Sequence, residues 1–235
     1  LATAVHFADE RMAVSRIRDA MGRWALPALV EQLLRRPHHL AQQGERRTMT
    51  ALACGLQGFD AASEKLAPRE LMRLLDEYVA AIFEAVATGH GQVDRAVGAT
   101  VVAYWGAPLP NARHAADAAR CALKLKEKLA RLSKRWRDKH EVELAPLLAV
   151  CTGDLLIGNL SGQGRLSQDR FAVFGPAMEA AERVMAANAA LGSVALLDEA
   201  AFEQVREDVS ARELDLVRVP GRVRPVRVLE LCCRR

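Results

Sequence analysis

The order of apolar segments from Thr48 onward restricts this chain to few folds. Apolar runs of strand length alternate with longer segments whose apolar residues recur every three to four positions, as in helices packed on one side. This order predicts an α+β sandwich, with a mostly antiparallel sheet and helices on one face. The predicted helices are residues 68–88, 112–138, Ala177–Asn188 and Glu199–Val205. The predicted strands are Thr48–Cys54, Val93–Val97, Thr100–Trp105, Val142–Cys151, Leu155–Leu160, Phe171–Phe174, Val194–Leu197, Leu214–Val219 and Pro225–Leu231.

Residues with strong conformational preferences mark the ends of several elements. Pro68 suits the first turn of a helix, and Gly89 is typical of a helix end. Asp198 is predicted to cap the helix that follows it, because its side chain can accept a hydrogen bond from the first turn. Gly98-Ala99 and Gly153-Asp154 are predicted turns, each between two strands.

Residues 1–45 differ from the rest and are predicted to form an N-terminal helical segment ahead of one domain at residues 46–235. Two interpretations of this segment remain open: an amphipathic helix packed on the domain, or a coupling helix from an upstream sensor. Pro27 is predicted to open a second short helix and Pro37 to end it. The apolar residues near helical spacing are Met12, Ile17, Met21, Trp24, Leu29, Val30, Leu33 and Leu34.

Composition excludes several classes of protein. Thirty-three Lys and Arg against 29 Asp and Glu give a net charge of +4, which is too even to indicate a nucleic-acid partner without a localised patch. Five cysteines without metal-ligand spacing favour a reducing compartment, so a cytoplasmic location is expected. No apolar run approaches the roughly 20 residues that cross a bilayer. The chain opens at Leu1 without an initiator Met or signal peptide, and is expected to be a fragment of a longer protein.

Many short motifs, in order along residues 22–231, resemble the class III adenylate/guanylate cyclase catalytic domain. The resemblance implies the ferredoxin-like cyclase fold. Residues 24–34, followed by Gly44-Glu45-Arg46-Arg47, are similar to the linker that joins membrane-anchored sensors to bacterial cyclases, which favours the coupling role. The motifs include Gly58-Phe59, Ser63-Glu64-Lys65-Leu66, Leu75-Asp76-Glu77-Tyr78, Val93-Asp94, Trp105-Gly106-Ala107-Pro108, His114-Ala115, Thr152-Gly153, Gly158-Asn159, Glu182-Arg183 and Pro225-Val226-Arg227-Val228.

The resemblance also identifies two positions where the expected chemistry is missing. Class III cyclases work as dimers, and two aspartates of one subunit hold two metal ions on the nucleotide triphosphate. Gly55 and Ala99 stand at those two positions, and neither side chain can coordinate a cation. Asp60 and Asp94 are the only carboxylates nearby; Asp94 matches another family position and Asp60 lies beyond the Gly-Phe loop, so a shifted register does not restore the pair.

The other site positions implied by the resemblance are also altered. Arg95 stands for a base-selecting Lys, and Pro176 for its Asp or Thr partner. Glu179 replaces a ribose-orienting Asn, and Pro220 a phosphate-contacting Lys. Arg183 is the one retained catalytic position, but it lies four residues after Glu179 and could instead form a salt bridge with it.

The backbone of one loop could still bind phosphate. Gly58 and Phe59 could keep the shape of a phosphate-binding loop, since backbone amides need no side chain, or could form a plain structural turn.

These positions lead to one main hypothesis and two alternatives. The main hypothesis is a degenerate, catalytically inactive cyclase homology domain that acts as a dimerising signal-transduction module downstream of a sensor, with no cofactor. Upstream segments could tether it to a membrane. One alternative is a cyclase subunit that makes cyclic nucleotide from ATP or GTP with an intact partner, using Mg²⁺ or Mn²⁺. The other is a domain that binds a nucleotide without reacting, although Glu179 and Pro220 argue against ATP or GTP binding.

Overall fold

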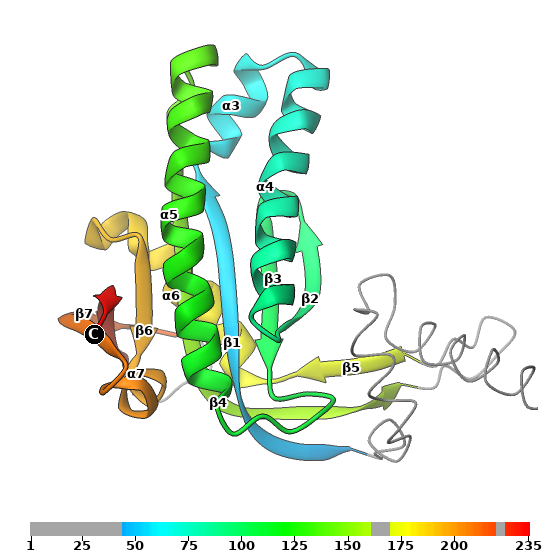
Figure 1. Cartoon of the computed structure of the whole chain (residues 1–235), viewed down its shortest axis with the longest axis vertical. Coiled ribbons are helices and arrows are strands. Elements are labelled where there is room, and N and C mark those ends of the chain that lie inside the picture. Colours follow the sequence, from blue (N-terminus) through cyan, green and yellow to red (C-terminus); the bar gives the residue numbers. More distant parts are fainter. Residues whose placement is uncertain (1–43, 161–169, 220–223) are drawn as a thin grey trace, which may run out of the picture.

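The computed structural model describes residues 44–160, 170–219 and 224–235 (Figure 1). The predicted N-terminal coupling segment therefore lies outside the described residues, except for its last two positions, and remains a prediction. The helices are α3 (Phe59–Lys65), α4 (Pro68–Thr88), α5 (His114–His140), α6 (Pro176–Leu191) and α7 (Glu199–Val205). The strands are β1 (Glu45–Gln57), β2 (Gln92–Val97), β3 (Thr100–Trp105), β4 (Ala145–Leu160), β5 (Arg170–Phe174), β6 (Ala195–Asp198), β7 (Val209–Val217) and β8 (Val226–Arg234).

The strands form one sheet in the order β2-β3-β1-β4-β6-β8-β7, and β5 pairs with the far end of β4. All pairs are antiparallel except β4 with β6. The long strands β1 and β4 form the centre. α5 lies across them, and α4 lies beside α5 over β2 and β3 (Figure 1). This arrangement confirms the predicted α+β fold with a mostly antiparallel sheet.

Alternation along β1 separates two cores on opposite faces of the sheet. Leu52 and Cys54 belong to the core shared with α4 and α5, whereas Ala51 and Ala53 belong to the core shared with α6. The prediction of helices on one face is therefore wrong for α6, which packs on the opposite face. Its short side chains, many of them alanine, allow it to lie close to the sheet.

The predicted ends of α4 are confirmed. Pro68 is its first residue, and the backbone N–H of Gly89 donates back to the carbonyl oxygens of the last turn. The indole Nε1 of the fully buried Trp105 on β3 donates to the carbonyl oxygen of Gly89 at 2.7 Å. The end of α4 is thus tied to the hairpin β2–β3, whose turn falls at Gly98-Ala99 as predicted.

The prediction of two strands around a turn at Gly153-Asp154 is wrong. β4 runs without interruption through both residues, because β1 pairs with it from Ala145 to Ile157. Gly153 pairs with Met49 and Asp154 with Thr48, and the Thr48 hydroxyl donates to the Asp154 carboxylate at 3.0 Å. The ladder with β1 therefore outweighs the local turn preference of a Gly-Asp pair.

The remaining predicted elements are present, with one addition. Asp198 caps α7 as predicted, since its carboxylate accepts a hydrogen bond from the Ala201 N–H at 2.8 Å. The short helix α3 was not predicted. No helix in the described residues is long and apolar enough to span a membrane. All five cysteines lie in the described ranges and none forms a disulfide.

A chain of buried polar side chains crosses the sheet from α5 to α7. The Thr50 hydroxyl lies 2.8 Å from Nδ1 of His114 and 2.6 Å from the Thr152 hydroxyl. The backbone N–H of Thr152 donates to the Asp198 carboxylate at 3.1 Å. The hydroxyls of Thr50 and Thr152 and the Asp198 carboxylate each have a partner, so these polar residues can be buried without a large desolvation cost.

We expect His114 to make the fold less stable in mild acid. Burial lowers the pKa of His114, although Asp117 opposes the shift. The unfolded chain then binds a proton near pH 6.5 and the folded chain only at lower pH. The stabilisation that neutral His114 contributes to the folded chain is therefore complete above about pH 6.5. It declines as the pH falls below that value. Urea unfolding between about pH 7.5 and pH 5.5 measures this decline.

His114→Gln is the matched control for this pH dependence, because glutamine keeps a hydrogen-bonding group and does not titrate. The variant should lose stability less steeply in this range than the parent chain. If the free energy of unfolding fell equally steeply with pH in the two proteins, His114 would not be the source of the pH dependence.

Candidate functional site

Gly55 and Ala99 lie at the same end of two neighbouring strands. β1 and β3 are antiparallel and pair Cys54 with Val101, so Gly55 and the turn residue Ala99 come close together. Gly55 is buried, and its position in the alternation of β1 directs it toward α6. Ala99 is half-buried. The two positions singled out in the sequence therefore lie close along the backbone, but Ala99 packs toward the α4 and α5 core and Gly55 faces α6. Neither side chain supplies an oxygen atom.

A methionine fills the space beside Gly55. A Cβ atom placed on Gly55 would lie 3.0 Å from both Cε and Sδ of Met185 on α6. Met185 is itself buried, with 8% of its surface exposed. A side chain longer than alanine at position 55 would therefore have to displace Met185, and it would enter an apolar core.

Arg95 on β2 is held by two carboxylates. Its guanidinium donates to Asp94 at 2.7 Å and, across to α6, to Glu182 at 2.7 Å. Burial by itself would lower the pKa of Arg95, but the hydrogen bonds and charges of Asp94 and Glu182 outweigh it and raise that pKa. Asp94, the nearest carboxylate in sequence to Ala99, is thus committed to an ion pair.

The candidate residues of α6 lie on its exposed side. Pro176 is the first residue of the helix, and Glu179 and Arg183 are both exposed. No ion pair joins Glu179 to Arg183, although both belong to the described part of the chain, so the salt-bridge alternative for Arg183 is not supported. Pro220 lies outside the described residues.

The family model described as "Adenylate and Guanylate cyclase catalytic domain" matches residues 42–229. The chain belongs to this family. The match covers most of the range over which the sequence motifs resemble class III cyclases.

Relatives and solved structures agree with the cyclase family. Adenylate cyclase 1 of Rhizobium meliloti (strain 1021) is 28% identical over 222 residues, covering 93% of this chain and 33% of that protein. Adenylate cyclase of Anabaena cylindrica is 25% identical over 196 residues, covering 79% of this chain and 37% of that protein. The chain thus spans about a third of the length of these curated relatives. The adenylyl cyclase CyaB from P. aeruginosa has the same fold, with a TM-score of 0.73, 20% identity, and coverage of 83% of this chain and 98% of that one.

The residues of this cyclase domain do not fit the two divalent ions that the family implies. Such ions need several oxygen ligands, usually carboxylates. Gly55 and Ala99 offer none, Met185 fills the adjacent space, and Asp94 is paired with Arg95. Among the residues that the structure describes, no group of three or more His, Cys, Asp or Glu could hold a metal ion.

Gly58 and Phe59 occupy a tightly packed corner of the cyclase domain. Gly58 precedes α3 with φ of 82°, and a Cβ atom on it would lie 2.0 Å from the carbonyl oxygen of Glu143. Phe59 packs against the core beneath α4 and α5. The close approach of two backbone segments explains the glycine without a bound phosphate.

Two residues that shape the site were not predicted as part of it. Met185 has the spacing of a core residue, four positions after Ala181 and three before Asn188, which indicates burial but not contact with Gly55. Glu182 was noted only as part of a family motif. Its pairing with Arg95 spans 87 residues of sequence, and no local pattern reports such a contact.

Proposed function

We propose that this cyclase-family domain does not cyclise nucleotides. It acts in the cytoplasm as a dimerising module that transmits a signal from an N-terminal sensor. The observation that carries the proposal is Met185 packed against Gly55. Metal ions in phosphoryl-transfer sites activate the nucleophile and clamp the phosphates, and their contribution amounts to several kcal/mol. Every 1.36 kcal/mol corresponds to about tenfold in rate.

The charges around the same site also argue against a bound triphosphate. Arg95 is neutralised by Asp94 and Glu182, so it has little positive charge to offer a phosphate. Glu179, exposed in the first turn of α6, adds a negative charge at a helix end that would otherwise attract anions. The proposal therefore includes no nucleotide and no divalent metal.

Exposed apolar side chains on β4 and β5 favour a dimer. Leu156 on β4 and Phe174 on β5 pair directly across the two strands, and they are 37% and 45% exposed. This pair lies at the end of β5 that leads into α6, whereas the opposite end of β4 and β5 extends beyond the helices (Figure 1). Apolar pairs in such a position are stabilised by contact with another molecule. A second copy of this chain, or a related cyclase chain, is the proposed partner.

A nucleotide assay with calorimetry tests the proposal. The full chain should produce no cyclic AMP or cyclic GMP above background from ATP or GTP with Mn²⁺, and should bind neither nucleotide at micromolar concentration. Turnover above background would contradict it. Metal-free micromolar binding without product would instead support the nucleotide-binding alternative. Light scattering should give the mass of a dimer, and a monomer at all concentrations would contradict that part.

Restoring the missing carboxylates is expected to leave the domain inactive. Gly55→Asp together with Ala99→Asp supplies two ligands, but Arg95, Pro176 and Glu179 remain unchanged. We expect cyclase activity within about tenfold of background, since each missing transition-state contact costs about 1.4 kcal/mol or more. The measurement is product formation with Mn²⁺, alongside circular dichroism to establish folding. Rescue by several orders of magnitude would show that the metal ligands alone were decisive.

A second function, a cyclase subunit active with an intact partner chain, is favoured by the names of the relatives. Both are adenylate cyclases, and Arg183 is exposed on α6 where a partner could reach it. In this case Mg²⁺ or Mn²⁺ would be bound by the partner's carboxylates. Mixing the chain with an intact cyclase domain distinguishes the two: a rate increase that Arg183→Ala abolishes supports the second function.

A further inference from the structure

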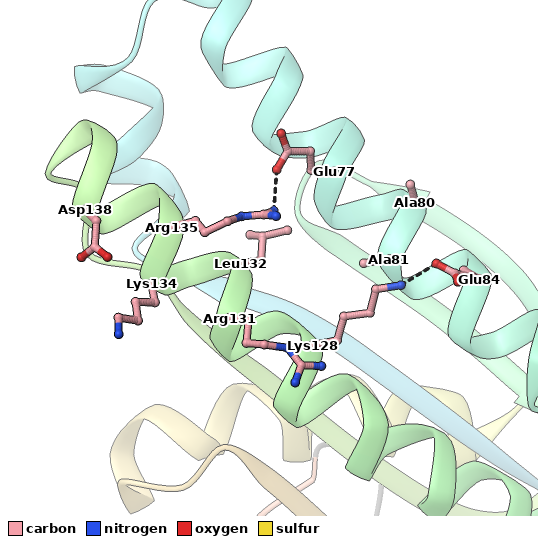
Figure 2. A pocket seen from close by; sticks show the side chains of 10 residues that line it. All are labelled: Glu77, Ala80, Ala81, Glu84, Lys128, Arg131, Leu132, Lys134, Arg135 and Asp138. Atoms are coloured by element: carbon pink, nitrogen blue, oxygen red, sulfur yellow. Dashed lines mark hydrogen bonds and ion pairs between the residues drawn. The ribbon is translucent and has the colours of Figure 1, made fainter.

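Three carboxylates of α4, spaced seven residues apart, each face a basic side chain of α5. The three pairs are Glu84 with Lys128, Glu77 with Arg135, and Glu70 with His140, and Figure 2 shows the first two. In the third pair, Oε2 of the carboxylate lies 3.6 Å from Nε2 of the imidazole. Lysine and arginine remain charged near neutral pH, whereas histidine gains or loses its charge there. Only one of these three contacts between the helices therefore depends on a proton.

The contact between Glu70 and His140 is incomplete. Both facing atoms, Oε2 and Nε2, are buried, and neither has a hydrogen-bond partner within the described residues. Their separation exceeds the distance of about 2.7–3.2 Å that an N–H···O hydrogen bond spans. Buried polar atoms without a partner are costly. A protonated imidazole donates from both ring nitrogens, so it would supply the missing donor to the carboxylate.

The surroundings favour a charge on each partner. Glu70 lies in the first turn of α4, where the helix dipole is positive, and His140 is the last residue of α5, where the dipole is negative. The imidazole also stacks on Trp136, with 4.6 Å between the ring centroids, and a cation is attracted to the face of an indole. The indole Nε1 donates to Glu77 at 3.2 Å, which holds the ring in place.

Most other charged groups at this end of α5 neutralise one another. They form three pairs: Lys65 of α3 with Glu141, Arg137 with Glu143, and Arg73 of α4 with Glu77. Arg69, Asp138 and Lys139 are exposed and have no ion pair among the described residues, and solvent screens their effect on the imidazole. The Glu70 carboxylate is therefore the dominant charge that faces His140.

We propose that the Glu70–His140 pair is a pH-sensitive latch, which fixes the end of α5 to the start of α4 when His140 is protonated. In the protonated state the ion pair and its hydrogen bond form. In the neutral state two buried polar atoms remain unpaired, and the last turn of α5 opens more readily. The latch lies where α3, the start of α4 and the end of α5 meet (Figure 1). This inference goes beyond the proposed function and holds whether or not the domain makes cyclic nucleotide.

The two ends of α5 respond to acid in opposite directions. The first residue of the helix is His114, and burial lowers the pKa of His114, so acid weakens the folded contacts at that end. At the last residue, His140, acid strengthens the contact with Glu70. A fall in pH thus moves stability along α5 from its N-terminal end to its C-terminal end.

Hydrogen exchange at the end of α5 tests the latch. The backbone N–H of Glu141 donates to the carbonyl oxygen of Arg137 at 2.8 Å, so its exchange reports opening of the last turn. We expect the protection factor of this amide, measured by NMR on the full chain, to rise at least about threefold from about pH 7.5 to about pH 5.5. The protection factor is already corrected for the intrinsic effect of pH on exchange. A constant or falling protection factor would overturn the proposal.

Variants of the two partners assign the pH response. Glu70→Gln and His140→Gln each remove one charge, so both should reduce the rise to less than about 1.5-fold. Circular dichroism establishes that each variant folds. A rise that survives in Glu70→Gln would rule out the latch.

The matched control is Glu84→Gln, which removes a carboxylate of the same helix whose partner Lys128 stays charged over this pH range. This variant should keep the threefold rise, and so should His114→Gln, which removes the histidine at the other end of α5. Loss of the rise in Glu84→Gln would show that it comes from the contact between the helices as a whole and not from His140.

Discussion

Replacing Gly55 with aspartate is expected to lower the free energy of unfolding by about 3 kcal/mol near neutral pH. The new carboxylate would enter the apolar core between β1 and α6, where Met185 already lies 3.0 Å from the position of its Cβ atom. The Arg95 guanidinium, which contacts α6 at Glu182, is already paired with two acids and would not compensate this charge. Urea unfolding at about pH 7.5, with and without Mn²⁺, measures the loss.

Gly55→Asn and a change of pH separate charge from size. Asparagine has the same shape without the charge, so we expect it to cost about 1–2 kcal/mol at every pH. Burial should raise the pKa of the introduced carboxyl, so the difference between the two variants should shrink at about pH 5.5. An Asp variant as stable as the parent, or one that Mn²⁺ stabilises strongly, would mean that the space beside Met185 is open to solvent or metal.

Replacing Gly58 with alanine is expected to cost about 4 kcal/mol of unfolding free energy. Its φ of 82° is a left-handed conformation, which costs a residue with a Cβ atom about 1–2 kcal/mol. The Cβ atom would also lie 2.0 Å from the carbonyl oxygen of Glu143, and a backbone atom cannot rotate away as a flexible side chain can. The measurement is the shift of the urea midpoint at unchanged slope.

Gly98→Ala is the matched control for Gly58→Ala. Gly98 also has a positive φ, of 56°, but a Cβ atom there would meet no other atom within 4 Å. It should therefore cost only the conformational part, about 1 kcal/mol. If the two substitutions cost the same, the contact with Glu143 would not explain why position 58 is a glycine. A role of Gly58 in binding phosphate would then be favoured.

Several parts of the fold were predictable because their signals are local. The first and last residues of α4 follow from Pro68 and Gly89, and α7 begins after Asp198 because an aspartate in that place satisfies a free N–H. The hairpin β2–β3 follows from two apolar runs around Gly98-Ala99. The family itself follows from many short motifs in order.

Other parts depended on partners that lie far away in sequence. The interruption predicted at Gly153-Asp154 does not occur, because β1 pairs with both residues from about a hundred positions earlier in the chain. The placement of α6 on the second face was missed because its alanine-rich sequence shows little difference between its sides. The pairing of Arg95 with Glu182 follows from that placement.

The sequence by itself determined the family, the order of the elements and the absence of acidic side chains at positions 55 and 99. Each of these features depends only on residue identity and local periodicity. Only the tertiary structure decided what occupies those places. The contact of Met185 with Gly55 and the pairing of Arg95 with Glu182 both result from close packing between distant segments. Such contacts arise when the sheet brings its two helical layers together, and no run of neighbouring residues encodes them.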